Sequence, residues 1–229
     1  MRTFLFLAIA LVTAGSFQST NPAATAGEKP VTADWEALFK DKSMKGWEGL
    51  KEHWSFSQEG LVGTNLPDGL PYRTFLCNKK KYQDFEIRFQ VRLKGPAEAN
   101  SGFNFRSRIL DRDKFTVSGP QADIGQQVWG ALSSEFIPGK PSTAIRLAPM
   151  AVLAKVKQQD FNDYSVKCVG NHVTIKLNGE ITVDDNFPWM AKEGIIAWQI
   201  HVNPTEVTFR NVQIRDLSAE PLLRAVEKK

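Results

Sequence analysis

The strict alternation of apolar and polar residues in DFEIRFQVRL, residues 84–93, constrains the fold most. Apolar side chains stand at every second position from Phe85 to Leu93, with charged or amide side chains between them. A period of two predicts a β-strand with one buried face and one solvated face. The same alternation flanks Asn178 and Gly179 in HVTIKLNGEITVDD, residues 172–185. Because this pair tolerates the positive φ angles of a two-residue type I′ turn, the segment predicts a β-hairpin.

Short strands, rather than helices, account for most of the chain after residue 30. Runs rich in β-branched and aromatic residues predict further strands at 54–57, 61–64, 74–77, 102–108, 115–118, 164–169, 194–201 and 205–214. Helical periodicity is limited to a short turn near 34–39 and to the segment 221–229. With 229 residues, 42% of them hydrophobic, the chain can bury one large core. The pattern predicts an all-β fold, a jelly-roll β-sandwich of two antiparallel sheets over residues 27–217, followed by a polar C-terminal tail at 218–229.

The N-terminus has the pattern of a secretory signal. A positive start at Arg2 precedes the apolar run FLFLAIALV, which is too short to span a bilayer, and small residues follow it. Residues 1–26 are therefore interpreted as a signal peptide and flexible leader, with cleavage after Ala14 or Ala26. The mature protein is expected to be periplasmic or secreted and to have no membrane span, and an uncleaved N-terminal anchor is the alternative.

The charged residues do not indicate a nucleic-acid-binding protein. The 29 Lys and Arg residues are interspersed with 25 Asp and Glu residues, and the net charge is only +4. The densest basic run, NKKKY at 78–82, is interpreted as an exposed connection between strands. Cys77 and Cys168 are the two cysteines, and they either form a disulfide, which an oxidising compartment permits, or remain two buried thiols. The sequence contains no CxxC or HExxH metal-binding motif.

Two further predicted strands carry polar side chains on one face. In NSGFNFRSR, alternation places the two phenylalanines on one face and Asn104, Arg106 and Arg108 on the other. In GIIAWQIH, Gln199 and His201 end one face. A sheet face of this kind is either solvated by bulk water or forms a groove for an oxygen-rich ligand. The hypothesis is that the arginine-bearing face lines such a groove.

Eight segments occur in an order that resembles the secreted 3-keto-disaccharide hydrolase family: LFKDKSMKGWEGL, HWSFSQEGLVGT, TFLCNKKKYQDFEIRFQVRL, NSGFNFRSR, SGPQADIG, VWGALSSE, DFNDYSVKCVGNHVTIKLNGEITVDD and GIIAWQIHVNPTEVTFRNVQI. The resemblance covers about residues 34–217 and depends on the order of the segments, because no single motif is decisive. It implies a concanavalin-like or laminin-G-like jelly roll that acts on glycosides already oxidised at carbon 3 of the sugar ring. Members are described as 3-keto-glucoside lyases and 3-keto-glucal hydratases.

The implied reaction needs no organic cofactor. A ketone at carbon 3 acidifies the hydrogen on carbon 2, so a base can remove it and the aglycone can leave from carbon 1. Water then adds to the double bond, and the net result is hydrolysis without the paired carboxylates of ordinary glycosidases. The chain has no GxGxxG fingerprint. A separate nicotinamide-dependent oxidoreductase is therefore expected to make the oxidised glucoside or disaccharide that serves as substrate.

The resemblance implies three kinds of site residue. Asp123 is the first candidate for the general base and His201 the second, and Arg106 is the candidate for stabilising the enolate oxygen. Arg108 and Gln121 are the candidates for supporting Arg106 at that oxygen. Gln199, Asn104 and Glu135 are the candidates for hydrogen bonds to sugar hydroxyls, and Trp129 is the candidate for stacking on a sugar ring.

Each candidate also has a purely structural interpretation. Asp123 could cap the Gly-Pro turn before it, and His201 could be a strand-end histidine bonded to loop backbone. Arg106 could form an ion pair with a carboxylate of the loop 111–113, and Trp129 could belong to the core.

One segment departs from the family. Related sequences commonly have a Tyr-Asp pair where this chain has Ser133 and Ser134. If that pair positions substrate, altered specificity or reduced activity would follow. Residues 136–160 have no regular pattern and are interpreted as loops at the edge of the pocket.

Two alternatives remain open. A divalent metal could be calcium bound by VDDN, residues 183–186, or an ion held by His201 with Asp123 or Glu135, although no spacing requires either. The alternative function is a non-catalytic carbohydrate-binding jelly roll, because fold alone does not settle activity.

Overall fold

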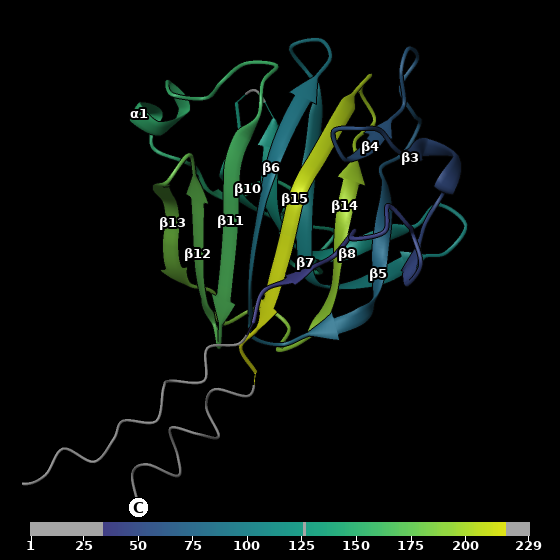
Figure 1. Cartoon of the computed structure of the whole chain (residues 1–229). Coiled ribbons are helices and arrows are strands. Elements are labelled where there is room, and N and C mark those ends of the chain that lie inside the picture. The colour runs from purple at the N-terminus through teal and green to yellow at the C-terminus, as the bar shows by residue number, and fades with distance from the viewer. Residues whose placement is uncertain (1–33, 126, 219–229) are drawn as a thin grey trace, which may run out of the picture. The chain divides into compact units, whose positions relative to one another are not determined.

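A computed structural model describes residues 34–125 and 127–218. The predicted signal and leader, the helical segment at 221–229 and the tail after residue 218 lie outside these residues. The described chain folds into a β-sandwich of two sheets (Figure 1), which confirms the predicted all-β jelly roll. All strand pairs are antiparallel.

In the part of the chain that the structure describes, one sheet has eight strands and the other has seven. The eight-stranded sheet consists, in spatial order, of β13 (Glu180–Asn186), β12 (His172–Leu177), β11 (Asn162–Val169), β6 (Phe85–Lys94), β15 (Glu206–Asp216), β4 (Leu61–Thr64) and β3 (Trp54–Phe56), with β1 (Glu36–Ala37) beside β15. The seven-stranded sheet consists of β10 (Ala144–Arg146), β9 (Leu132–Glu135), β8 (Thr116–Gly125), β7 (Asn100–Asp111), β14 (Gly194–Ile200), β5 (Thr74–Tyr82) and β2 (Trp47–Glu48). The helical elements within residues 34–125 and 127–218 are η1 (Lys51–His53) and α1 (Met150–Leu153).

The two strongest sequence patterns are confirmed. The apolar residues of β6 from Phe85 to Leu93 are all buried, and the polar residues between them are not. The hairpin of β12 and β13 turns at Asn178 and Gly179, whose φ angles of 50° and 84° are both positive, as a type I′ turn requires. The turn expected near 34–39 contains β1, and β9 and β10 lie in segments where no strand was predicted.

Aromatic packing between the sheets fixes which way the strands of the site face. Trp198 of β14 has its ring centroid 4.4 Å from that of Phe209 and 5.1 Å from that of Phe89, both in the eight-stranded sheet. Such pairs contribute about 0.5–1.5 kcal/mol beyond their buried area. Because Trp198 and Phe103 point into this core, their neighbours on β14 and β7 point to the outer face of the seven-stranded sheet.

The cysteines do not pair. Cys77 and Cys168 are free and buried, and they belong to β5 and β11, in different sheets. The disulfide alternative is therefore wrong and the alternative of two buried thiols is confirmed. The basic run 78–82 is part of β5 rather than a connection between strands.

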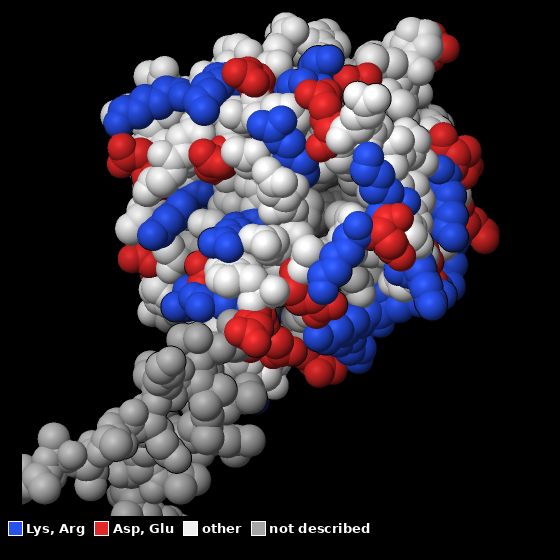
Figure 2. Space-filling model, in the orientation of Figure 1, with Lys and Arg blue, Asp and Glu red and all other residues white. Residues whose placement is uncertain are grey.

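Charge is mixed on the face of the molecule that Figure 2 shows, where Lys and Arg side chains lie among Asp and Glu. In the orientation shared by Figures 1 and 2, the eight-stranded sheet lies in front. No helix within residues 34–125 and 127–218 has the length and apolar character needed to cross a membrane.

Candidate active site

A pocket of about 230 Å³ opens on the outer face of the seven-stranded sheet. Its lining residues come from five neighbouring strands, β10, β9, β8, β7 and β14, and from the loops beside them: Arg73, Asn100, Gln121, Asp123, Val128, Ser133, Glu135, Ser142, Thr143, Ala144, Gln199 and His201. Five of the nine predicted site residues are among them.

Two larger hollows, of about 350 and 490 Å³, lie over strands of the eight-stranded sheet. The acidic side chains that line them, Asp163 and Glu59, are exposed. In the smaller pocket, Asp123 and Glu135 are each only 4% exposed. Because acid–base chemistry depends on carboxyl groups whose pKa is shifted by burial, the smaller pocket is the candidate site.

Strand alternation brings the polar side chains of the pocket together. On β8, Ala122 and Ile124 enter the core, so Gln121 and Asp123 face outward. Gln199 reaches the same pocket from β14, because both of its neighbours in the strand are core residues.

Gly102, which has no side chain, leaves the space in which the side chains of Gln121, Asp123 and Gln199 meet. It lies opposite Asp123 in the pairing of β7 with β8, and a Cβ atom on it would be 2.5 Å from the carboxamide carbon of Gln121. Without that atom, the Gln121 carboxamide spans the strand. Its Nε2 donates to Asp123 Oδ1 at 2.7 Å, and its Oε1 accepts from Gln199 Nε2 at 2.9 Å.

Asp123 has a hydrogen-bond donor at each carboxyl oxygen. Gln121 donates to Oδ1, and the Ser133 hydroxyl donates to Oδ2. Burial raises the pKa of Asp123 to about 7, against the opposing effect of these donors. Both protonation states are therefore accessible near neutral pH, as a general base requires. The turn-capping interpretation is wrong, because both oxygens of Asp123 accept from side chains within the sheet.

Arg73 supplies the positive charge of the pocket, and sequence reasoning missed it. Its Nη1 donates to Glu135 Oε1 at 2.6 Å, and Glu135 is buried. Burial raises the pKa of Glu135, and Arg73 opposes this effect. Arg73 directly precedes β5, whose Phe75 pairs with Gln199. The signal that could have found it is this pairing of strands, which the sequence pattern alone did not provide.

Two lining residues present polar atoms that have no partner. His201 Nδ1 and Asn100 Oδ1 are buried and make no hydrogen bond with any described residue. Burial, together with the charge of Arg73, lowers the pKa of His201 to about 4. The imidazole is therefore neutral at physiological pH and can exchange hydrogen bonds with ligand hydroxyl groups.

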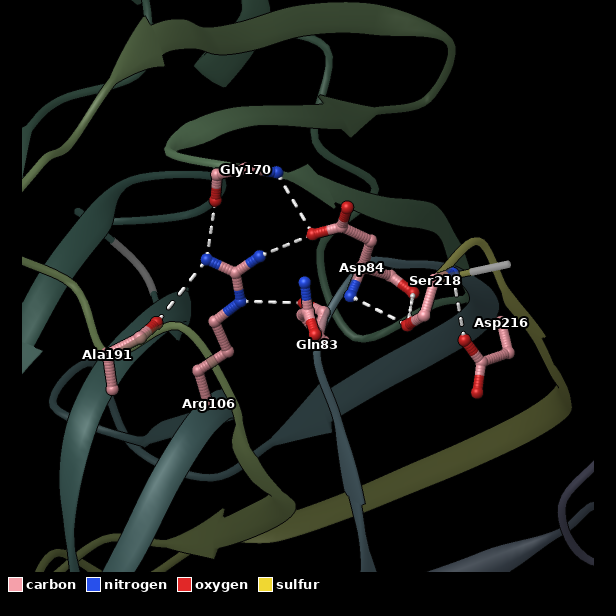
Figure 3. Close-up of polar contacts among 7 residues, drawn as sticks. All are labelled: Gln83, Asp84, Arg106, Gly170, Ala191, Asp216 and Ser218. Atoms are coloured by element: carbon pink, nitrogen blue, oxygen red, sulfur yellow. Dashed lines mark hydrogen bonds and ion pairs between the residues drawn. The ribbon is translucent and has the colours of Figure 1, made fainter. Parts of the chain in front are cut away.

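Arg106 is not among the residues that line this pocket, so its predicted position at the enolate is wrong. Figure 3 shows its guanidinium group directed instead toward Asp84, Gly170 and Ala191. Its φ of 43° marks a bulge at which the register of β7 shifts against β8 and β14. Its Nη2 donates to Asp84 Oδ1 at 2.9 Å, and its other nitrogens donate to the carbonyl groups of Gln83, Gly170 and Ala191.

The Arg106 network is a structural connection between loops. The exposed fractions of the Arg106 and Asp84 side chains are 1% and 7%. Figure 3 shows the same network continuing from Asp84 to Ser218. The alternative of an ion pair between Arg106 and the loop 111–113 is also wrong, because Asp84 is the partner.

Three other candidates lie outside the pocket. Arg108 comes after the bulge and is exposed. Trp129 belongs to the hydrophobic core, so the prediction that its ring stacks on a sugar in the groove is wrong. Asn104 is fully buried on β7, where its carboxamide has no hydrogen-bond partner among the described residues.

Ser133 and Ser134 have different roles. Ser133 reaches Asp123, whereas the Ser134 hydroxyl donates to the Pro141 carbonyl at 2.5 Å and ties down the loop 136–143. The end of this loop contributes Ser142 and Thr143 to the pocket. Part of the unpatterned segment thus lies at the pocket edge, as predicted.

The described ranges, 34–125 and 127–218, contain no cluster of three or more His, Cys, Asp or Glu side chains suited to a metal ion. In VDDN, Asp184 accepts from the Thr174 hydroxyl at 2.8 Å, and Asp185 pairs with Arg146 at 2.7 Å. Both carboxylates of the predicted calcium segment are therefore engaged by protein groups.

Solved structures share this fold at low sequence identity. A predicted glycosyl hydrolase from Parabacteroides distasonis has a TM-score of 0.57 and 20% identity, over 80% of this chain and 100% of that chain. The carbohydrate-binding module CBM66 from Bacillus subtilis has a TM-score of 0.56 and 17% identity, over 75% and 96%. A Bacillus subtilis protein with a galectin-like fold has a TM-score of 0.58 and 11% identity, over 80% and 94%. These similarities establish a lectin-like jelly roll as the class of fold.

The chain belongs to the family of 3-keto-alpha-glucoside-1,2-lyase-like domains, which matches residues 34–215. This membership confirms the resemblance seen in the ordered sequence segments, and it supports a carbohydrate-active function. None of the curated proteins compared with the chain matches it significantly.

Proposed function

We propose that this chain is an exported enzyme that cleaves 3-keto-glycosides by elimination of the aglycone and hydration of the product. The observation that carries the proposal is Asp123, a carboxyl group buried in a polar pocket with a pKa raised to about 7. Family membership supports the substrate class. The signal-like N-terminal sequence supports export to the periplasm or medium.

Asp123 is the base in this mechanism. Its ionised carboxylate takes the proton from carbon 2, and the electrons of that C–H bond move toward the carbon 3 ketone to give an enolate. As the ketone re-forms, these electrons make the double bond between carbons 2 and 1, the bond from carbon 1 to the aglycone oxygen breaks, and the departing oxygen takes up a proton. Gln121 and Gln199 hold the carboxylate in place, because their carboxamides form a chain that ends on Oδ1. A base positioned in this way contributes about 10²- to 10⁴-fold to the rate.

Arg73 takes the role that sequence reasoning gave to Arg106. It lines the pocket, and Glu135 fixes one of its nitrogens. Its remaining N–H groups stabilise the negative charge that develops on the carbon 3 oxygen. His201 and Asn100 also line the pocket, and their polar side chains bind sugar hydroxyls. Water then adds to the double bond of the product.

Nothing in this mechanism oxidises carbon 3. A separate nicotinamide-dependent oxidoreductase therefore has to supply the 3-keto-glycoside.

Turnover of a 3-keto-glucoside by the mature protein, followed by aglycone release, tests the proposal. Asp123→Asn should reduce kcat about 10³-fold, and Arg73→Gln should reduce it substantially. Ser118→Ala, on β8 but outside the pocket, is the matched control and should leave turnover unchanged. Binding of the sugar without any turnover would instead identify a non-catalytic carbohydrate-binding module.

A further inference from the structure

The pocket has room for one sugar ring and little more. Its volume of about 230 Å³ is below the roughly 300–1,000 Å³ typical of pockets that enclose drug-sized ligands. If the keto sugar occupies this space beside Asp123, the aglycone of the proposed substrate has to lie at the mouth of the pocket. The residues at the mouth therefore determine which aglycones are accepted.

Phe136 presents an aromatic ring beside this pocket. It comes directly after Glu135, and its ring centroid is 5.5 Å from the guanidinium carbon of Arg73; both of these neighbours line the pocket. The residue is 44% exposed, and it is the one exposed phenylalanine within the ranges 34–125 and 127–218. Exposed aromatic rings beside a polar pocket are suited to packing against flat ligand groups.

The backbone holds Phe136 in an unfavourable conformation. Its φ of 45° lies in the left-handed region, which is rare for a bulky residue. The loop fixes this conformation, because the Phe136 N–H donates to the Ser142 hydroxyl at 3.1 Å and Ser134 holds Pro141. Strained residues persist where the surrounding structure determines them, and they cluster at ligand sites.

We infer that Phe136 forms an aglycone subsite, on which the leaving group packs while the keto sugar occupies the pocket. The ligand chemistry is a ring with a flat apolar face, which an aryl group or the second pyranose of a disaccharide can supply. This inference rests on the proposed function, because it takes the substrate and the reacting carboxylate from it.

Kinetics with phenyl, glucosyl and methyl 3-keto-glucosides test the subsite. Comparing the variant with the unmodified protein for each substrate removes differences in leaving-group reactivity. In Phe136→Ala, kcat/KM should fall about tenfold for the phenyl substrate, the glucosyl substrate or both, and by less than about twofold for the methyl substrate. A loss confined to one of the two ring substrates identifies the kind of ring. Equal losses for all three substrates would overturn the inference.

Three further variants separate the subsite from folding. Phe136→Trp should restore the preference for ring aglycones. Phe136→Gly should lose it while folding normally, because glycine accepts the left-handed φ without strain. Leu110→Ala removes a side chain that is also 47% exposed but lies outside the pocket, and it should change none of the three rates.

Failure of the proposed function gives a different result from failure of the subsite. If the unmodified protein turns over none of the three substrates, the proposed function is wrong. Calorimetric binding of phenyl and methyl glucoside then decides about the subsite. Loss of the phenyl preference in Phe136→Ala supports it, and an unchanged preference overturns it.

Discussion

At the scale of single residues, Asp123 experiences two opposing effects on its ionisation. Removal from water favours the neutral acid, whereas hydrogen bonds from Ser133 and Gln121 favour the carboxylate. The balance leaves a group that can accept a proton at neutral pH and later release it. A carboxyl with its ordinary pKa would be a weaker base, and one shifted much further would remain protonated.

The dependence of activity on pH results from this balance. We predict that kcat/KM rises as the pH is raised through about 7, because only the ionised carboxylate can accept the proton from carbon 2. His201, with its pKa lowered to about 4, should add no inflection near 6.5. Ser133→Ala removes a donor to the carboxylate, so it should move the inflection to higher pH. An inflection that stays in place in Ser133→Ala would contradict the assignment to Asp123.

The same pKa shift predicts an effect on stability. The pKa of Asp123 in the folded chain, about 7, lies above its ordinary value of 3.8. The folded state therefore binds more protons than the unfolded state between these values, and stability falls as the pH rises from about 4 to about 7. Asparagine does not ionise, so the Asp123→Asn protein should not lose stability over this pH range. Its free energy of unfolding should exceed that of the unmodified protein by about 1–3 kcal/mol at pH 8 and differ little from it at pH 4. Urea unfolding at the two pH values measures the difference, and equal differences at both would contradict the shift.

At the scale of structural elements, Gly102 of β7 leaves the space that the Gln121 carboxamide needs to link Asp123 of β8 with Gln199 of β14. A methyl group at this position would displace the Gln121 carboxamide, which a Cβ would approach to 2.5 Å. Gly102→Ala should therefore lower kcat/KM about 10- to 100-fold, because a displacement of about 1 Å at a catalytic group can cost a factor of this size. Gln121→Ala in the same background should add little further loss, since both changes remove one support. If the fold-losses in kcat/KM of the two single variants instead multiply in the double variant, Gly102 does not act through Gln121.

The stability of the fold also depends on the bulge of β7 at Arg106, whose side chain is buried in an ion pair with Asp84. Removing one partner of a buried ion pair leaves the other charge uncompensated, which costs about 3–5 kcal/mol. We expect Arg106→Ala to reduce the free energy of unfolding by this amount, while the folded protein keeps kcat/KM within about twofold, because Arg106 makes no contact with the pocket. Arg108→Ala, at the exposed position two residues on, should change stability by less than about 0.5 kcal/mol. A loss of activity in folded Arg106→Ala would restore the arginine to the site.

These elements also show how far the sequence could predict the site. The period of two correctly assigned Gln199 to the outer face of β14, where its neighbours Trp198 and Ile200 enter the core. Gln121 and Asp123 came from the family resemblance instead, because the strand predicted at 115–118 ended before them, whereas β8 continues to Gly125. The period of two failed at Arg106, since a bulge adds a residue and reverses the faces to which the later side chains of the strand point. Arg73 could not be found from local pattern, because its place in the pocket depends on the pairing of β5 with β14.

At the scale of the whole molecule, the described residues form one large core between the two sheets and a small apolar cluster on the outer face of the seven-stranded sheet. Cys168 lies in the large core, and Cys77 lies in the small cluster with Phe75, Val117 and Ala197. The two thiols are thus enclosed by different parts of the fold. The stability of the sandwich therefore comes from packing rather than from a covalent link between the sheets.

This arrangement predicts that the protein is insensitive to reductant. A disulfide of typical strength contributes about 2–4 kcal/mol, and its reduction would lower Tm by several degrees. Because Cys77 and Cys168 are free, reductant should change Tm by less than about 1 °C. Burial raises the pKa of both thiols to about 12, so a thiol reagent should react slowly with the folded protein and with two thiols per chain once urea unfolds it. Fewer than two reactive thiols in the unfolded, unreduced protein would show that the cysteines are linked after all.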